Sequence, residues 1–168
     1  SQIQKLSVET SHPKWWIERW IKQFGLFETE QITNANNQIP KLAFRMTPKF
    51  HRKDLAIQKE ILESFEGNVS KSELVDESFI ANKFDENLRE LVTKGFIYFQ
   101  DEGSQMIASS VGLKGGESFL DICASPGSKA TFIAKQSSNN LMVAGDFYGH
   151  RVRTLQGNCL SQDIESIE

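Results

Sequence analysis

At 168 residues the chain can form one full domain or two small ones, and its formal charge of −3 gives no bulk electrostatic support for binding nucleic acid. Cys123 and Cys159 are far apart and lack clustered histidines, which excludes a disulfide framework or a zinc site built on neighbouring ligands. With no signal peptide or long apolar segment, we expect a protein of the reducing cytoplasm, without membrane insertion and without a bound metal.

The first part of the chain predicts two helices. Residues 1–10 are polar and unpatterned, as in a linker or a frayed terminus. Ser11 to Pro13 form a helix start signal, and apolar positions at helical spacing then run to Gly25. A second short helix is expected over 27–36. The three tryptophans of the first helix could stack on bases, but their spacing favours a face packed into a core.

A basic segment follows. Residues 41–47 alternate between polar and apolar, which predicts a strand with Leu42, Phe44 and Met46 on one face and Ala43 among polar residues on the other. We interpret the polar face either as a solvent-open surface that contacts RNA phosphates or as a solvated edge that prevents aggregation. Both interpretations stay open. The segment 41–53 holds five basic residues and no acidic one, and these are our candidate RNA-binding residues: Lys41, Arg45, Lys49, Arg52 and Lys53.

Further elements complete a small α+β domain. The pattern predicts a helix over 55–65, a weak strand over 79–81, an apolar turn over 88–92, a stronger strand over 95–100 and a helix over 103–111. In the helix over 55–65, four side chains are expected to point inward: Leu55, Ile61, Leu62 and Phe65.

The most informative stretch is 118–134, which predicts a strand, a tight loop and a helix. An apolar run ends abruptly at the small residues from Ala124 to Ser128, and apolar positions return at helical spacing from Phe132. A ligand could therefore lie directly against the backbone N–H groups that open the helix. Such loops, at the carboxyl ends of strands, bind nucleotides in open α/β sheets.

A second apolar run, 141–146, ends in Asp146, seventeen positions beyond Lys129. If a helix over 131–136 and a turn over 137–140 join two parallel strands, Asp146 lies at the same sheet edge as the small-residue loop, where its carboxylate can accept hydrogen bonds from ribose hydroxyls. Alternatively, Asp146 only caps the last helix, expected over 148–160.

Separated stretches of the chain resemble, in the right order, motifs of the NOL/NOP/Sun family of RNA cytosine methyltransferases, particularly its bacterial ribosomal-RNA members. Any one of these motifs alone would be a weak signal. The matching stretches are Ser-His-Pro-Lys-Trp from Ser11, Arg19 with Trp20, Asn36 with Asn37, Pro40 and the strand over 42–46, Phe-Gln-Asp-Glu-Gly-Ser-Gln from Phe99, Asp-Ile-Cys-Ala-Ser-Pro-Gly-Ser-Lys-Ala-Thr from Asp121, and Asp146 with Arg151.

The resemblance implies an α/β fold in which a small N-terminal α+β RNA-binding subdomain, residues 1–97, precedes the first half of a Rossmann-like methyltransferase domain, residues 98–168. It also implies S-adenosyl-L-methionine as cofactor and RNA, particularly ribosomal RNA, as partner. The implied cofactor-binding residues are Cys123, Ala124, Ser125, Pro126, Gly127, Ser128, Lys129, Asp146, which would hold the ribose, and Arg151.

The resemblance also implies the reaction: a cysteine thiolate attacks carbon 6 of cytosine, the methyl group moves to carbon 5, and a second cysteine assists elimination. The family's two cysteine motifs have no match within 1–168, so we assign no catalytic residue and expect this fragment to be inactive alone. Ser125 and Ser128 replace the family's alanine and glycine. Ser128 is therefore expected either to adopt a glycine-like backbone or to crowd the ligand.

Two function hypotheses follow, with a weaker third. The parent protein forms 5-methylcytosine in RNA, or the chain is a non-catalytic RNA-binding or ribosome-assembly module with a vestigial cofactor loop. A dinucleotide-dependent oxidoreductase is disfavoured because the loop lacks the glycine pattern of such enzymes. We interpret the three scattered histidines as structural or solvated.

Overall fold

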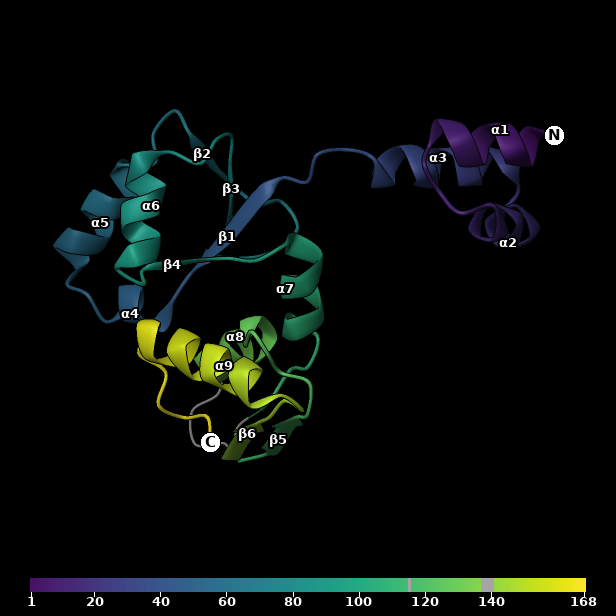
Figure 1. Ribbon diagram of the computed structural model, residues 1–168. Coiled ribbons are helices and arrows are strands. Elements are labelled where there is room, and N and C mark those ends of the chain that lie inside the picture. The colour runs from purple at the N-terminus through teal and green to yellow at the C-terminus, as the bar shows by residue number, and fades with distance from the viewer. Residues whose placement is uncertain (115, 137–140) are drawn as a thin grey trace. The chain divides into compact units, whose positions relative to one another are not determined.

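The computed structural model describes residues 1–114, 116–136 and 141–168 (Figure 1), so the turn expected over 137–140 lies outside the described residues. The chain divides into two compact units, Ser1–Pro40 and Lys41–Glu168. The division that we expect between 97 and 98 falls inside the second unit and stays a prediction.

The first unit contains helices α1 (Gln2–Glu9), α2 (Lys14–Phe24) and α3 (Leu26–Asn36). The expectation of a linker before residue 11 is wrong, because Ser1 caps α1 and Leu6 is buried. His12 joins the helices: its Nδ1 lies 2.7 Å from the Thr10 carbonyl oxygen and its Nε2 lies 3.2 Å from the Asn36 side-chain nitrogen. This histidine is therefore structural.

The tryptophans of α2 are not the core of the first unit. Ile17 is the buried residue of this helix, whereas Trp15 and Trp16 are exposed. The aromatic rings pack on one another instead, with Trp16 and Trp20 stacked at a centroid distance of 5.2 Å. The favoured core-face interpretation is therefore wrong for Trp15 and Trp16.

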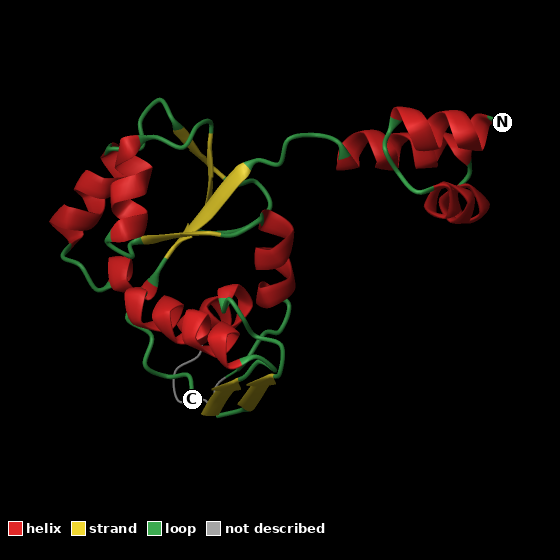
Figure 2. Ribbon diagram, in the orientation of Figure 1, coloured by secondary structure: helices red, strands yellow, loops and turns green. Residues whose placement is uncertain are grey.

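The second unit begins with a four-stranded antiparallel sheet, ordered β2-β3-β1-β4. Its helices α5 and α6 lie on one side of the sheet (Figure 2). Phe44 of β1 stands opposite Phe79 of β3 and Phe99 of β4 and packs with Phe65. The strands and their covering helices are β1 (Leu42–Met46), β2 (Val69–Lys71), β3 (Ser78–Ala81), β4 (Ile97–Phe99), α4 (Pro48–His51), α5 (Leu55–Glu63) and α6 (Glu86–Thr93).

The strand predicted within 41–47 is confirmed as β1, but Leu42 is exposed instead of lying in the core, and a solvent-open second face is wrong. Phe44 and Met46 lie in the core under α5 and α6, while Ala43, Arg45 and Thr47 are buried as well. The opposite face of β1 is covered, because Arg45 reaches α8 (Ser128–Gln136), a helix that packs on the second sheet. A strand buried on both faces cannot present phosphate-binding side chains to solvent.

Three local predictions also need correction. The turn expected over 88–92 is part of α6, which Asp85 caps by accepting a hydrogen bond from the Leu88 N–H. The helix expected over 55–65 ends at Glu63; its expected inward side chains Leu55 and Leu62 are exposed, and the core is made by Ile61 and by Phe65, which follows the helix. Strand β2 lies in a stretch without a strand pattern, since it has one apolar residue.

The second sheet has two parallel strands, β5 (Ser118–Asp121) and β6 (Leu141–Ala144), with Asp121 opposite Ala144. Helix α7 (Glu102–Ser109) leads into it, α8 (Ser128–Gln136) connects the strands, and α9 (Gly149–Ser161) follows β6. The strand, loop and helix predicted over 118–134 are confirmed. The core here is rich in small residues: Ala108, Ala124, Ala130, Ala134 and Cys159.

Candidate functional site

The small-residue loop between β5 and α8 is held at the carboxyl end of β6. The Ala124 N–H donates to the Gly145 carbonyl oxygen at 2.9 Å. In return, the Gly145 N–H donates to the Asp121 carbonyl oxygen at 2.8 Å. The Asp121 carboxylate in turn accepts from the Cys123 N–H at 3.1 Å. The loop is therefore fixed to the next strand by backbone bonds, which its small side chains allow.

Gly127 makes the tight turn into α8. Its φ of +100° is one that L side chains rarely adopt, and a Cβ added there would lie 2.5 Å from Cδ1 of Leu155. Its N–H donates to the Ala124 carbonyl oxygen at 2.6 Å. A glycine is required here both by the backbone conformation and by the close approach of α9.

The first turn of α8 presents backbone donors beside this glycine. The Thr131 N–H donates to the Gly127 carbonyl oxygen at 2.8 Å and is the first donor of the helical ladder. The preceding N–H groups, of Ser128, Lys129 and Ala130, lie in the first turn of α8, and N–H groups at a helix N-terminus favour negative charge. The exposed Lys129 adds a positive charge there. Ser128 is not among the described residues with positive φ, so it does not adopt a glycine-like backbone. The alternative, that Ser128 crowds the ligand, stays a prediction.

Asp146 and Arg151 lie next to the loop, as predicted from the parallel strands. The Asp146 Oδ2 accepts from the Ser125 N–H at 3.3 Å, and its Oδ1 lies 3.2 Å from Nη1 of Arg151. Arg151 also donates from Nη2 to the Ser125 carbonyl oxygen at 3.1 Å. Asp146 Oδ1 also accepts from the N–H of Tyr148, the N-cap residue of α9, at 3.5 Å. Because Asp146 is bonded to the loop as well, the alternative that it only caps this helix is wrong.

The Asp146 side chain is 2% exposed, whereas that of Arg151 is 45% exposed. Arg151 therefore covers a carboxylate that is already bonded to the loop. Little of the Asp146 carboxylate is open to a ligand in this arrangement. Of the predicted loop residues, Ala124, Ser125 and Gly127 are buried, while Cys123, Pro126 and Lys129 are exposed.

The basic residues of 41–53 do not form one surface. Arg45 is 1% exposed and must be removed from the RNA-binding candidates, because its guanidinium is enclosed between the two sheets. Lys49 Nζ and Arg52 Nη1 each lie 3.9 Å from a carboxylate oxygen of Asp163, just after α9. For Lys41, Lys49, Arg52 and Lys53, a contact with RNA stays a prediction.

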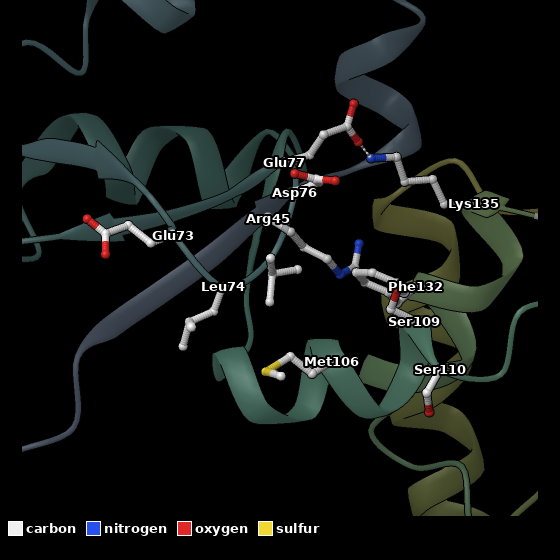
Figure 3. A pocket seen from close by; sticks show the side chains of 11 residues that line it. Arg45, Glu73, Leu74, Asp76, Glu77, Met106, Ser109, Ser110, Phe132 and Lys135 are labelled. Carbon is white, nitrogen blue, oxygen red and sulfur yellow. Dashed lines mark hydrogen bonds and ion pairs between the residues drawn. The ribbon is translucent and has the colours of Figure 1, made fainter.

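Arg45 borders a cavity of about 600 Å³ between β1, the segment before β3, α7 and α8. Figure 3 shows its side chain running toward Phe132 of α8, and Glu77 meeting Lys135 above it. Burial lowers the pKa of the Arg45 guanidinium to about 10, although Tyr98 acts in the opposite direction.

Sequence reasoning missed the partners of Arg45, which are Gln100 and Thr131. The only signal was that both lie in the stretches that resemble family motifs. Among the described residues there is no cluster of His, Cys, Asp or Glu able to hold a metal ion. In the same ranges, every helix is too short or too polar to span a membrane.

Comparison with known proteins gives a consistent family picture. A family model described as the ferredoxin-like domain of RsmF/B-like methyltransferases matches residues 12–80. The probable ribosomal RNA small subunit methyltransferase B of Bacillus subtilis is 29% identical over 156 residues, which cover 92% of this chain and 34% of that protein. The ribosomal RNA small subunit methyltransferase B of Klebsiella pneumoniae is 29% identical over 150 residues, 88% of this chain and 34% of that protein. The chain thus spans about a third of the length of these relatives.

Solved structures share the fold. A methyltransferase homologue from Pyrococcus horikoshii matches 99% of this chain and 55% of its own, with a TM-score of 0.82 and 18% identity. NSun6 from the same organism, solved with SFG, matches 90% of this chain and 63% of its own, with a TM-score of 0.69 and 13% identity. The expected fold class, an α+β subdomain followed by part of a Rossmann-like domain, is confirmed.

Proposed function

Since the chain belongs to the NOL/NOP/Sun family of methyltransferases, we propose that the protein of which it forms part methylates carbon 5 of a cytosine in RNA, with S-adenosyl-L-methionine as methyl donor. One observation carries this proposal: the loop from Cys123 to Lys129 is bonded to Asp146 at the carboxyl edge of two parallel strands. Open α/β sheets bind nucleotide-like ligands at this edge.

The residues of the loop fit such a cofactor. The N–H groups that open α8, together with Lys129, would bind its carboxylate, because a helix N-terminus and a cation both favour negative charge. Small side chains from Ala124 to Ser128 leave the backbone accessible to a ligand, and Gly127 provides the turn. When bound, the cofactor supplies an electrophilic methyl group; the chain's own residues bind and orient it.

Asp146 would accept hydrogen bonds from the ribose hydroxyls. Its carboxylate has two oxygens with about four acceptor sites, of which Ser125 and Arg151 take some. We propose that the Arg151 side chain moves toward solvent when ribose binds, while Asp146 keeps its bond to the Ser125 N–H. The solved NSun6 structure with SFG, an S-adenosylmethionine analogue, supports this choice of cofactor.

RNA, and ribosomal RNA in particular, is the proposed substrate. The names of the bacterial relatives support it, and Lys41, Lys49, Arg52 and Lys53 are the proposed phosphate contacts. The 168 residues supply no match to the family's cysteine motifs, so we propose that methyl transfer needs residues beyond them and that this chain alone is inactive. The alternative of a non-catalytic RNA-binding module is not favoured, because these relatives are methyltransferases.

The test is calorimetric titration of the chain with S-adenosylhomocysteine, compared with the variants Asp146→Ala and Asp76→Ala. Asp76 is an exposed carboxylate at the cavity beside Arg45, so its loss serves as a control for charge alone. We expect binding that Asp146→Ala loses and Asp76→Ala keeps. Absence of binding to the unaltered chain, or equal binding by Asp146→Ala, would contradict the cofactor site.

The exposed thiol of Cys123 offers a second measurement, because Cys159 is buried and burial raises the pKa of its thiol. A disulfide reagent should modify Cys123 first, since the thiolate is the reactive form. S-adenosylhomocysteine should slow this reaction in the unaltered chain but not in Asp146→Ala. A rate that the ligand leaves unchanged would place the ligand elsewhere.

A further inference from the structure

We propose that Arg45 is a positioning residue for the cofactor loop, acting through Thr131 on the turn at Gly127. The inference rests on the proposed function, because an effect of Arg45 on cofactor binding requires that the loop binds a cofactor. Arg45 belongs to an inner strand of the other sheet, and among the loop residues it contacts the carbonyl oxygen of Ser128.

The guanidinium of Arg45 spans the two sheets. Its Nε donates to Oε1 of Gln100 at 2.9 Å, and its Nη2 donates to Oγ1 of Thr131 at 2.8 Å. The same Nη2 lies 3.4 Å from the Ser128 carbonyl oxygen, a longer contact to the first residue of α8. The group lies between the rings of Tyr98 at 5.1 Å and Phe132 at 5.6 Å. Its orientation is thus fixed by both sheets.

Thr131 carries this constraint into the loop. Its hydroxyl accepts from Arg45 and donates to the Gly127 carbonyl oxygen at 2.7 Å. Its own N–H donates to the same oxygen at 2.8 Å, so Gly127 is held twice by one residue. Without Arg45, the hydroxyl could still reach Gly127, but Thr131 would lose its hydrogen bond to the four-stranded sheet.

On the other side of Arg45 the network continues into the sheet and α7. The side-chain nitrogen of Gln105 donates to the Gln100 carbonyl oxygen at 2.8 Å and to the Ser78 hydroxyl at 3.0 Å. The Gln100 N–H donates to the Ala43 carbonyl oxygen at 3.0 Å. Arg45 therefore connects a rigid frame to Thr131, because Gln100, Gln105 and Ser78 are all buried.

A buried arginine such as Arg45 lowers the stability of the fold if its only role is to fill space. No carboxylate of the described residues forms an ion pair with Arg45, and its Nη1 has no hydrogen-bond partner there. A buried charge without a counter-ion disfavours folding, and apolar residues of similar volume often stabilise such sites. The forked geometry, which reaches Gln100 and Thr131 at once, is what an apolar side chain would lose.

The first experiment measures amide hydrogen exchange in the absence of ligand, in the unaltered chain and in Arg45→Met. We expect the N–H groups of Gly127 and Thr131 to exchange about tenfold faster in Arg45→Met, the size of effect that loss of one hydrogen bond produces. Leu88→Ala is the matched control, because it weakens the opposite face of the same sheet without touching Arg45. Leu88→Ala should leave these two amides protected relative to those of β1.

Thr131 provides an independent pair of variants, which keeps the proposal testable if Arg45→Met does not fold. Thr131→Ser retains the hydroxyl and should exchange like the unaltered chain, whereas Thr131→Val should resemble Arg45→Met. The double variant should exchange no faster than either single one, because both remove the same connection. Unchanged exchange at Gly127 in both Arg45→Met and Thr131→Val would overturn the proposal, as would additive effects.

Titration with S-adenosylhomocysteine separates this inference from the proposed function. We expect about tenfold weaker binding in Arg45→Met and Thr131→Val, restored in Thr131→Ser and unaffected by Leu88→Ala. If the unaltered chain binds no ligand while exchange at Gly127 responds to Arg45, the proposed function fails and the positioning of the loop stands. Ligand binding that Leu88→Ala weakens as much as Arg45→Met would reduce Arg45 to a structural role and overturn the inference.

Discussion

The two sheets of the second unit are packed in opposite ways. The four-stranded sheet is filled by large aromatic rings, with Phe44 stacked on Phe79 at a centroid distance of 5.5 Å and Phe65 edge-on to Phe44. The buried cluster at the two-stranded sheet contains several alanines beside larger residues such as Phe132 and Met142, and one of these alanines, Ala124, is in the loop itself. Large side chains set helices at a distance from a sheet, whereas small ones let backbones approach each other.

The difference separates a supporting region from a binding region. In the alanine-rich part, α8, α9 and the loop come close enough for backbone bonds between the loop and β6. Leu120, Ile122 and Val143 of this part remain exposed, so its strands are buried less completely than β1. The aromatic cluster should therefore carry more of the stability and the alanine cluster more of the site's geometry.

The largest expected effect is that of Phe44→Ala. Because Phe44 is fully buried among aromatic rings, its loss should lower the free energy of unfolding by about 3–5 kcal/mol. Urea denaturation measures this, with Phe147→Ala as control, since Phe147 is almost fully exposed. Equal losses in the two variants would mean that the aromatic cluster is not the supporting core.

A smaller effect is expected when the alanine cluster is overfilled. Ala130→Leu adds bulk at a fully buried position of the first turn of α8 and should cost about 1–3 kcal/mol. It should also weaken S-adenosylhomocysteine binding more than its loss of stability explains, because α8 must move away from the loop. Ala56→Leu, at an exposed position of α5, is the control and should change neither quantity. Normal ligand binding by Ala130→Leu would mean that the alanine cluster does not set the geometry of the site.

Gly127→Ala tests the turn itself. The positive φ and the contact with Leu155 should together cost about 1 kcal/mol or somewhat more, since Leu155 can shift part of its side chain. Gly157→Ala is its counterpart: Gly157 is helical, has open space at its Cβ position, and should be stabilised by the change. Thermal unfolding of the two variants should move in opposite directions, and a shared direction would argue against strain at Gly127.

The smallest expected effect is that of pH on the contact between α8 and the segment before β3. The hydrogen bond from Lys135 lowers the pKa of Glu77, against the opposing effect of burial. Burial and the charge of Lys135 lower the pKa of His51, whereas the charge of Glu77 raises it. In both groups the unfolded state binds protons first, so stability should fall as the pH drops below 6.5 and again below 4.5.

Urea midpoints at pH 7, 5.5 and 4 measure this decline. Glu77→Gln should reduce the loss of stability between pH 5.5 and 4, and His51→Gln should reduce the loss between pH 7 and 5.5. Both side chains are partly exposed, so solvent screening keeps the effect small. A midpoint that rises on acidification would contradict the direction of both pKa shifts.

Local patterns were enough to predict the loop and its neighbours. An apolar run, small residues and a helical pattern follow one another within 118–134, and the parallel pairing then places Asp146 without further information. Helix α6 was missed because its apolar residues are confined to 88–92, about one helical turn, although Asp85 caps it in the way that a sequence can suggest.

The fate of Arg45 could not be predicted from its neighbours in the chain. Alternation in 41–47 shows that β1 has two faces, but not that α8, which begins more than eighty residues later, covers the second one. The basic segment therefore seemed solvent-open. Similarly, the spacing of the α2 tryptophans indicates one face, whereas the core position is taken by Ile17. Whether the second face of a strand is buried depends on tertiary contacts, which hydrophobic periodicity along the sequence does not reveal.

The bond between Arg45 and Thr131 also bears on the order of folding, because it joins residues 86 positions apart. Closing so long a loop costs entropy that only many simultaneous contacts can offset. We expect the aromatic sheet to form before α8 docks, so that the rate of folding responds to Phe44 and the rate of unfolding to Thr131. Stopped-flow kinetics of Phe44→Leu and Thr131→Val would measure this, and a slower folding rate in the second would reverse the order. In the expected order, the ligand site is the last part of the second unit to become native and the first to open.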